Sequence, residues 1–241
     1  LIWRVLGGPT QRTPSTPLCW LIIQLLPKSG PEIWCIDMPS PSITLYSYWR
    51  STTSYRVRAA LNLIGVTYQT VSVDLLANDQ HDAAYVSINP GKGVPTLVLE
   101  DGTVLTQSLA ILDFIEDTWP APALLPPAPR ARAQVLAAAH SLAVDVHPVN
   151  NLRVVKHLQD TQAASKDALK AWMQHWCLEG FTVFETLVSD TTPFAFGDTA
   201  GLADLCLIPQ TYNARRWDVD LTPFPNISRI EAACLALPAN A

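Results

Sequence analysis

The chain has 241 residues, of which 49% are apolar and 15% are charged, and its formal charge at neutral pH is −5. This apolar share excludes an intrinsically disordered chain, and the mild acidity argues against a general nucleic-acid binder, which needs a basic face. No apolar run approaches the roughly 20 residues of a membrane-spanning helix. Five Cys in a chain of this length do not indicate a disulfide scaffold.

Residues 1–42 differ from the rest of the chain. They hold seven of the 20 Pro and show no sustained hydrophobic period of 2 or 3.6 residues. We interpret them as a proline-rich leader that is disordered or non-native, with the biological sequence starting near Met38. The apolar stretch 18–26 leaves a signal-peptide reading open, although no small-residue cleavage site follows it.

Regular patterns begin at Ile43. Residues 43–48 alternate apolar and polar, which predicts a half-buried strand. Residues 55–64 carry apolar side chains at helical spacing, and Gly65 is placed to end that helix. Residues 66–73 are rich in β-formers and predict a second strand.

Two short strands and a helix follow. Residues 96–99 and 103–105 predict strands joined by a tight turn at 100–102. Ser108 suits a helix N-cap, and apolar residues at helical spacing follow it. The predicted order is therefore β-α-β and then β-β-α.

A proline-rich linker divides the body of the chain. Residues 121–129 contain four Pro, which continue neither a helix nor a sheet ladder. After them we find only helical patterns, at residues 130–158, 166–187 and 202–212. The sequence therefore predicts an α/β domain at 43–122, a linker at 123–129 and an all-helical domain at 130–241.

Several motifs together resemble the zeta class of glutathione transferases. The most specific are STTSYRVRAAL at 51–61 and PVNNLR at 148–153, while NP…VPTL at 89–97 and QSLAI at 107–111 are found more widely among glutathione transferases. Further matches lie at 203–210 and 213–216. The resemblance runs from about residue 43 to the end, and family members usually continue further, which raises the question of a missing C-terminal tail.

This resemblance implies a glutathione-transferase architecture: a thioredoxin-like N-terminal domain and an all-α C-terminal domain. It also implies glutathione as cofactor, a small dicarboxylate substrate, a cytoplasmic homodimer, and no nucleic-acid or membrane partner. The class includes cis-trans isomerases of maleylacetoacetate and maleylpyruvate. Their reaction consists of thiolate addition, rotation about the resulting single bond and elimination of glutathione.

The turn before the first helix is the expected catalytic centre, with Arg50, Ser51 and Thr52 as catalytic residues. A free thiol with a pKa near 8.5 is mostly protonated at neutral pH, so the site must stabilise the thiolate. The Ser51 hydroxyl and the positive end of a helix both do so. The alternative is that Ser51 only caps the helix.

Six residues are expected to bind glutathione by resemblance. Val94 and Pro95 match a cis-proline turn that exposes the Val94 backbone to the cysteinyl part, although a trans proline at a strand start stays open. The helix start at Gln107 and Ser108 is suited to the γ-glutamyl carboxylate, beside the Ser51 hydroxyl. Gln80 aligns with a contact to the glycyl end, or is a solvated loop residue.

Three arginines are expected to bind the carboxylates of the substrate: Arg50, Arg153 and Arg216. The planar guanidinium fork suits a carboxylate. Arg215 is the alternative to Arg216, and each of these residues is alternatively a solvated surface charge. Asn150 is expected to orient the substrate or to serve a turn. Among the histidines, His147 is the one expected at the edge of the substrate cleft.

One position departs from the family pattern. Thr53 stands where many zeta enzymes have Cys, and the chain has no Cys-x-x-Cys, which excludes a thiol-exchange function. Asp198 and Asp204 suggest a metal or acid-base site, but we interpret Asp204 as a helix cap and expect no metal.

Three functions stay open at this point. The first is a glutathione-dependent isomerase acting on maleylacetoacetate or maleylpyruvate. The second is a transferase of the same class acting on α-halo acids and other electrophiles. The third is a non-catalytic module of this architecture used as a scaffold.

Overall fold

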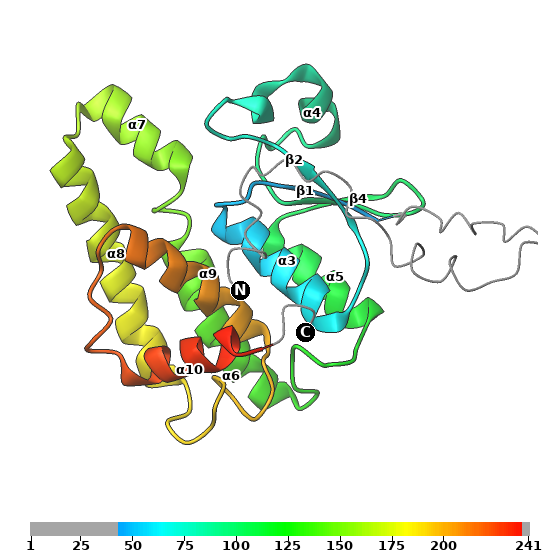
Figure 1. Ribbon diagram of the computed structural model, residues 1–241, viewed down its shortest axis with the longest axis vertical. Coiled ribbons are helices and arrows are strands. Elements are labelled where there is room, and N and C mark those ends of the chain that lie inside the picture. Colours follow the sequence, from blue (N-terminus) through cyan, green and yellow to red (C-terminus); the bar gives the residue numbers. More distant parts are fainter. Residues whose placement is uncertain (1–42, 238–241) are drawn as a thin grey trace, which may run out of the picture.

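The computed structural model describes residues 43–237. The predicted leader at 1–42 therefore lies outside the described residues. The described chain divides into a small sheet with its helices and a larger helical part (Figure 1). Among the described helices, none is long and apolar enough to cross a lipid bilayer.

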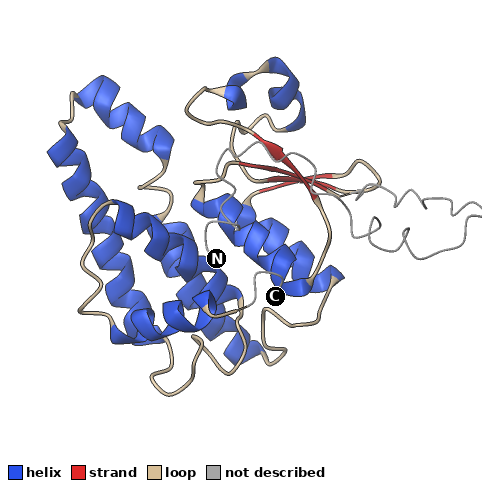
Figure 2. Cartoon of the chain, viewed as in Figure 1, coloured by secondary structure: helices blue, strands red, loops and turns tan. Residues whose placement is uncertain are grey.

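The sheet has four short strands in the order β2-β1-β3-β4. They are β1 (Thr44–Ser47), β2 (Gln69–Ser72), β3 (Thr96–Val98) and β4 (Val104–Thr106). The strand β1 pairs in parallel with β2 and antiparallel with β3, and β3 pairs antiparallel with β4. Leu45 and Leu97 face each other in the register of β1 and β3, and both are fully buried. The predicted β-α-β and β-β-α order is confirmed. Figure 2 shows the strands gathered in this one sheet.

Two helices cover one face of this sheet. They are α3 (Thr52–Ile64) and α5 (Ser108–Thr118), which pack against each other, while α4 (Ala83–Ile88) lies on the other side beside the short 3-10 turn η2 (Asp79–His81) (Figure 1). Gly65 ends α3 with a φ of 82°, a left-handed conformation that favours glycine, as the sequence predicts.

The helical part begins with α6 (Pro129–His140), so the last residue of the predicted linker is the first residue of a helix. The division at 43–122, 123–129 and 130–241 stays a prediction. The other helices are α7 (Leu152–Gln162), α8 (Lys166–Leu187), α9 (Leu202–Arg216) and α10 (Pro225–Leu235).

The continuous helical pattern predicted at 130–158 is wrong. After α6 the chain forms a π-helical segment, η3 (Ser141–Val146), and then a turn before α7 starts. Pro148 has no N–H to continue a helix, and a π turn rotates the residues that follow it. The break brings His147, Asn150 and Asn151 together at one place.

Gly180 permits this arrangement. It lies in α8 beneath η3, and a Cβ atom built on it would stand 2.1 Å from a methyl carbon of Val146. A side chain at this position would therefore push η3 away from α8. The absence of a side chain lets the π-helical segment pack closely on the helix behind it.

One hydrophobic core runs through both parts of the molecule. The helix α9 is buried along most of its length and packs against α3, α6 and α10. Its first turn is held by Asp204, whose carboxylate accepts hydrogen bonds from the N–H groups of Gly201 (2.8 Å) and Ala195 (2.9 Å). The predicted capping role of Asp204 is confirmed. Since α3 lies directly on α9, the start of α3 is fixed against the helical part.

Candidate active site

A cleft of about 1150 Å³ separates the sheet part from the helical part. On one side lie the first turns of α3 and α5, and on the other lie η3, α7 and parts of α8 and α9. The lining contains every residue that the sequence assigned to the site: Arg50, Ser51, Thr52, Gln80, Val94, Pro95, Gln107, Ser108, Asn150, Arg153 and Arg216.

Ser51 stands at the N-cap of α3. Its Oγ accepts a hydrogen bond from the Ser54 N–H at 3.2 Å, so the predicted capping role is present. Ser51 Oγ also lies 2.8 Å from Thr53 Oγ1, and Thr53 donates its own proton to the Val94 carbonyl at 2.8 Å. Ser51 is consequently the donor to Thr53. Thr53, which stands where many zeta enzymes have Cys, thus links the Ser51 hydroxyl to the Val94 backbone, which is predicted to bind glutathione.

The Val94–Pro95 peptide bond is cis, so the prediction is confirmed and the trans alternative is wrong. Neighbouring side chains hold the turn. The Asn89 amide donates to the Gly93 carbonyl at 2.9 Å and to Thr96 Oγ1 at 2.8 Å.

Ser108 is not the N-cap of α5, contrary to the prediction. The N-cap is Gln107, which has a φ of 68°, and Ser108 is the first helical residue. Such a positive φ in a residue other than Gly is strained and is typical of functional sites. The Ser108 hydroxyl instead accepts a hydrogen bond from Arg56 Nη1 at 3.3 Å.

Arg56 and Arg58 differ in their surroundings. Arg58 donates to Ser47 Oγ at 2.7 Å and to the carbonyls of Tyr48 and Trp49, which ties down the chain between β1 and α3. Arg56 is 1% exposed, and its Nε and Nη2 have no recorded partner among the described residues. Burial lowers the pKa of the Arg56 guanidinium. Arg56 therefore contributes a positive charge to the lining of the cleft, close to Ser108.

Two amide oxygens in the lining are buried without a recorded partner among the described residues: Oε1 of Gln80 and Oδ1 of Asn150. An unpaired buried acceptor is costly, so each is suited to a ligand that donates a hydrogen bond. Gln80 is 8% exposed, which contradicts its reading as a solvated loop residue. The amide nitrogen of Asn150 lies 3.5 Å from the Met173 carbonyl.

The arginines predicted for the substrate reach the cleft from different elements. Arg50 precedes α3, Arg153 lies in the first turn of α7 and Arg216 is the last residue of α9. Burial and the positive charge of Arg50 lower the pKa of Arg216. An anion placed between Arg50 and Arg216 would offset their mutual repulsion and stabilise both charges.

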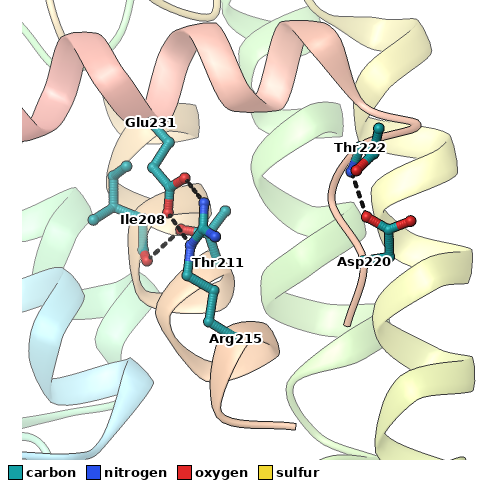
Figure 3. A network of polar contacts seen from close by, with 6 residues as sticks. All are labelled: Ile208, Thr211, Arg215, Asp220, Thr222 and Glu231. Atoms are coloured by element: carbon teal, nitrogen blue, oxygen red, sulfur yellow. Dashed lines mark hydrogen bonds and ion pairs between the residues drawn. The ribbon is translucent and has the colours of Figure 1, made fainter. Parts of the chain in front are cut away.

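Arg215 is turned away from the cleft. It pairs with Glu231 of α10, with Arg215 Nε 3.2 Å from Glu231 Oε1 (Figure 3). Arg215 also does not belong to the lining, whereas Arg216 does. Of the two arginines, only Arg216 therefore lines the cleft.

His147 contacts the first turn of α3 from the helical side. Its Nδ1 lies 2.8 Å from Thr52 Oγ1, and its Nε2 lies 3.4 Å from the Asn151 amide nitrogen. Burial, together with the positive charges of Arg56 and Arg153, lowers the pKa of His147 to about 3. The imidazole is therefore neutral at physiological pH. The sequence placed His147 at the cleft edge but carried no signal for its contact with Thr52.

The charge of the lining opposes the net charge of the chain. The lining has two acidic side chains, Asp167 and Asp218, and Asp218 is already paired with Lys170 at 2.7 Å. Within residues 43–237 no group of three or more His, Cys, Asp or Glu is arranged to hold a metal ion. The cleft is thus a cationic, hydroxyl-lined site suited to anionic ligands.

The comparisons with known proteins agree with this geometry. Residues 41–117 match the N-terminal domain of glutathione S-transferases. The maleylacetoacetate isomerase of Rhizobium meliloti is 44% identical to the chain over 197 residues, covering 81% of the chain and 92% of the relative.

Solved structures extend the likeness to the fold. A bacterial zeta-class maleylpyruvate isomerase, solved in its holo form, superposes with a TM-score of 0.79 at 42% identity, covering 82% of the chain and 94% of that structure. The maleylacetoacetate isomerase of Methylobacterium extorquens AM1, solved with bound malonate and glutathione, gives a TM-score of 0.77 at 38% identity, with coverages of 82% and 94%. The chain is an enzyme of the maleylacetoacetate isomerase family, the zeta class of glutathione transferases.

Proposed function

We propose that this enzyme converts maleylacetoacetate to fumarylacetoacetate with glutathione as a cofactor that is regenerated in each turnover. The observation that carries this proposal is the convergence of Arg50, Arg153 and Arg216 on the cleft that Ser51 lines. A cis-configured dicarboxylate needs cations for two carboxylates and for the charge that develops on its conjugated carbonyl. The similarity to curated isomerases supports the same substrate class.

The residues present fit glutathione. The backbone of Val94 and the first N–H groups of α5 at Gln107 and Ser108 suit its cysteinyl part and its γ-glutamyl carboxylate. The buried Gln80 Oε1, which has no recorded partner among the described residues, suits a peptide N–H near the glycyl end. Glutathione, when bound, supplies a thiolate that adds reversibly to a conjugated double bond.

The chain's own groups support that chemistry in three ways. The Ser51 hydroxyl can turn from Thr53 towards a thiolate, while the N-terminus of α3 adds positive potential. The arginines hold the two carboxylates and stabilise negative charge on the carbonyl oxygen.

The second candidate substrate is maleylpyruvate, which the structural relative with a TM-score of 0.79 favours. The two substrates differ in length, but both carry two carboxylates, so the same arginines can bind both. Purified enzyme is assayed on each substrate with glutathione at far less than stoichiometric amounts. We expect the higher kcat/KM for maleylacetoacetate, and a clear preference for maleylpyruvate would overturn that assignment.

The same assay separates isomerase from transferase chemistry. An isomerase leaves the glutathione concentration unchanged, whereas a transferase acting on an α-halo acid consumes one glutathione per product. Consumption that is stoichiometric with maleylacetoacetate turnover contradicts the isomerase proposal. Failure of the protein to bind glutathione-agarose would instead favour the scaffold alternative.

We also propose that the enzyme is a cytoplasmic homodimer. Several large apolar side chains are exposed in the described chain, among them Trp49 (38%) and Val104 (40%), and a second copy could cover them. Light scattering during gel filtration measures the mass directly. A monomeric mass at micromolar concentration would count against the dimer.

A further inference from the structure

A chain of hydrogen bonds leads from the start of α7 to the catalytic turn. It joins the Arg153 N–H, the Asn151 side chain, the His147 imidazole and the Thr52 hydroxyl, with donor–acceptor distances of 3.1, 3.4 and 2.8 Å. The first of these groups has only one possible role, since a backbone N–H can only donate. The direction of every later bond follows from this one.

The orientation of the Asn151 amide is set first. Its Oδ1 accepts the Arg153 N–H, because Asn151 is the N-cap of α7. The NH2 group therefore faces His147 Nε2 and donates to it. A flipped amide would place two donors face to face at the cap, which the geometry of α7 does not tolerate.

The tautomer of His147 is set next. Nε2 accepts from Asn151 and therefore carries no proton, so the proton of the neutral ring is on Nδ1. An imidazolium or the other tautomer would point an N–H at the Asn151 NH2 group. Nδ1–H therefore donates to Thr52 Oγ1.

The last consequence concerns Thr52. Its oxygen accepts from His147, so its own proton is not needed for that bond. His147 is the only recorded hydrogen-bond partner of the Thr52 hydroxyl in the part of the chain that the structure describes. Thr52 lines the cleft beside Ser51, whose proton is shared with Thr53. In the ligand-free site the two adjacent hydroxyls thus differ: the Ser51 proton is donated to Thr53, whereas the Thr52 proton has no recorded acceptor among the described residues.

We propose that Asn151 and His147 are positioning residues that commit the Thr52 hydroxyl to donating a hydrogen bond to an anionic atom of the ligands in the cleft. The inference rests on the proposed function for the identity of those ligands. The acceptor is either the thiolate sulfur of glutathione or an oxygen of the dicarboxylate. Both are anions, and the experiments below distinguish them.

The first test needs neither ligand, so its failure is distinct from failure of the proposed function. Nitrogen NMR of the ligand-free protein, labelled at histidine, reports the protonation of each ring nitrogen. We expect His147 as the neutral Nδ1–H tautomer at pH 7, identified by loss of its signals in the His147→Asn variant. An Nε2–H tautomer or an imidazolium at pH 7 overturns the inference.

The second test uses Thr52→Val, which removes the hydroxyl and keeps the shape, with Thr52→Ser as the conservative variant. We expect Thr52→Val to lower kcat/KM about tenfold and Thr52→Ser to restore most of it. The ultraviolet absorbance of the bound thiolate assigns the acceptor. A raised thiol pKa identifies the sulfur, and an unchanged thiol pKa with a raised KM for the dicarboxylate identifies the oxygen. If neither quantity changes, the proposal is wrong.

The third test concerns His147 itself. In His147→Asn an amide N–H stands close to the position of Nδ1–H, whereas His147→Leu has no donor. We expect His147→Asn to keep at least about a third of kcat and His147→Leu to lose about tenfold. His157→Asn, at an exposed position of α7 outside the lining, is the matched control and is expected to leave kcat unchanged. Equal losses in the Asn and Leu variants would contradict a role in donation.

Discussion

The two sides of the cleft are built from different groups. On the sheet side, apart from Arg50, the lining groups expected to bind ligands are mostly main-chain atoms and short hydroxyls: the Val94 backbone, the starts of α3 and α5, Ser51 and Thr52. On the helical side they are long cationic side chains, Arg153 and Arg216, with the imidazole of His147. The first side depends on backbone geometry, and the second depends on side-chain identity.

This difference indicates a division of labour. A surface of backbone groups suits one constant ligand, such as glutathione, because any sequence that keeps the fold keeps the contacts. A surface of long side chains can change by single substitutions without disturbing the core. We therefore expect substitutions on the sheet side to alter glutathione chemistry and kcat, and those on the helical side to alter the KM of the dicarboxylate.

The largest effect is expected for Ser51→Ala, which should lower kcat by more than about tenfold through loss of a donor to the thiolate. The substitution also removes a helix cap, which costs about 1 kcal/mol of stability. Ser165→Ala is the matched control, because Ser165 caps α8 through the Ala168 N–H at 3.1 Å and lies outside the lining. Steady-state kinetics and thermal unfolding of both variants make the measurement. Comparable activity losses in the two would show that only capping matters.

A neighbouring pair of arginines tests the helical side. Arg216→Leu should raise the KM of the dicarboxylate about tenfold, because Arg216 lines the cleft. Arg215→Leu should leave KM unchanged and lower the stability by about 1 kcal/mol at most, since its partly exposed pair with Glu231 joins α9 to α10 (Figure 3). Substrate titrations and urea unfolding of both variants are compared. The reverse pattern would reinstate Arg215 as the substrate ligand.

A smaller effect is expected for Arg153→Ala. Arg153 is exposed at the mouth of the cleft, where solvent screens its charge, so we expect a rise of about threefold to fivefold in the KM of the dicarboxylate with little change in kcat. Arg130→Ala, an exposed position at the start of α6 outside the lining, serves as the control. A drop in kcat without a change in KM would show that Arg153 acts on the glutathione chemistry and would contradict its role in binding the dicarboxylate.

The last prediction concerns the dependence of folding stability on pH. The folded-state pKa of His147, about 3, lies below the 6.5 of a free imidazole. Neutral His147 therefore contributes stability that is fully present above pH 6.5 and is lost as the pH falls towards 3. Between pH 7.5 and pH 5 the wild type should lose about 2 kcal/mol of unfolding free energy relative to His147→Asn in urea unfolding. A constant difference across this range would contradict the pKa shift.

Much of the fold was predictable because local rules decide it. The alternation at 43–48, the stop at Gly65 and the Asp204 cap depend on neighbours a few residues away, and the structure contains each of them. The first helix starts at Thr52 and not at residue 55, because Ser51 caps it. The helix α10 carried no pattern that we identified in the sequence.

Part of the site could be predicted only as a set of residues. The motifs placed Ser51, the cis-proline turn and three arginines in the site, and all of them line one cleft. The motifs favoured Arg216 but left Arg215 open as an alternative, and the choice matters because adjacent residues on a helix differ by about 100° in direction. The packing of α9 against α10 directs Arg215 towards Glu231 and leaves Arg216 in the lining of the cleft.

The sequence by itself determined the local elements, the family motifs and the residue types that the cleft contains. Only the tertiary structure decided how those residues pair. The contact between Thr52 and His147 joins residues 95 positions apart, and it exists because a π-helical turn packs over Gly180 while α3 lies on α9. Short-range patterns record the conformational preferences of neighbouring residues, whereas contacts across a cleft depend on how whole helices pack, which no local pattern records.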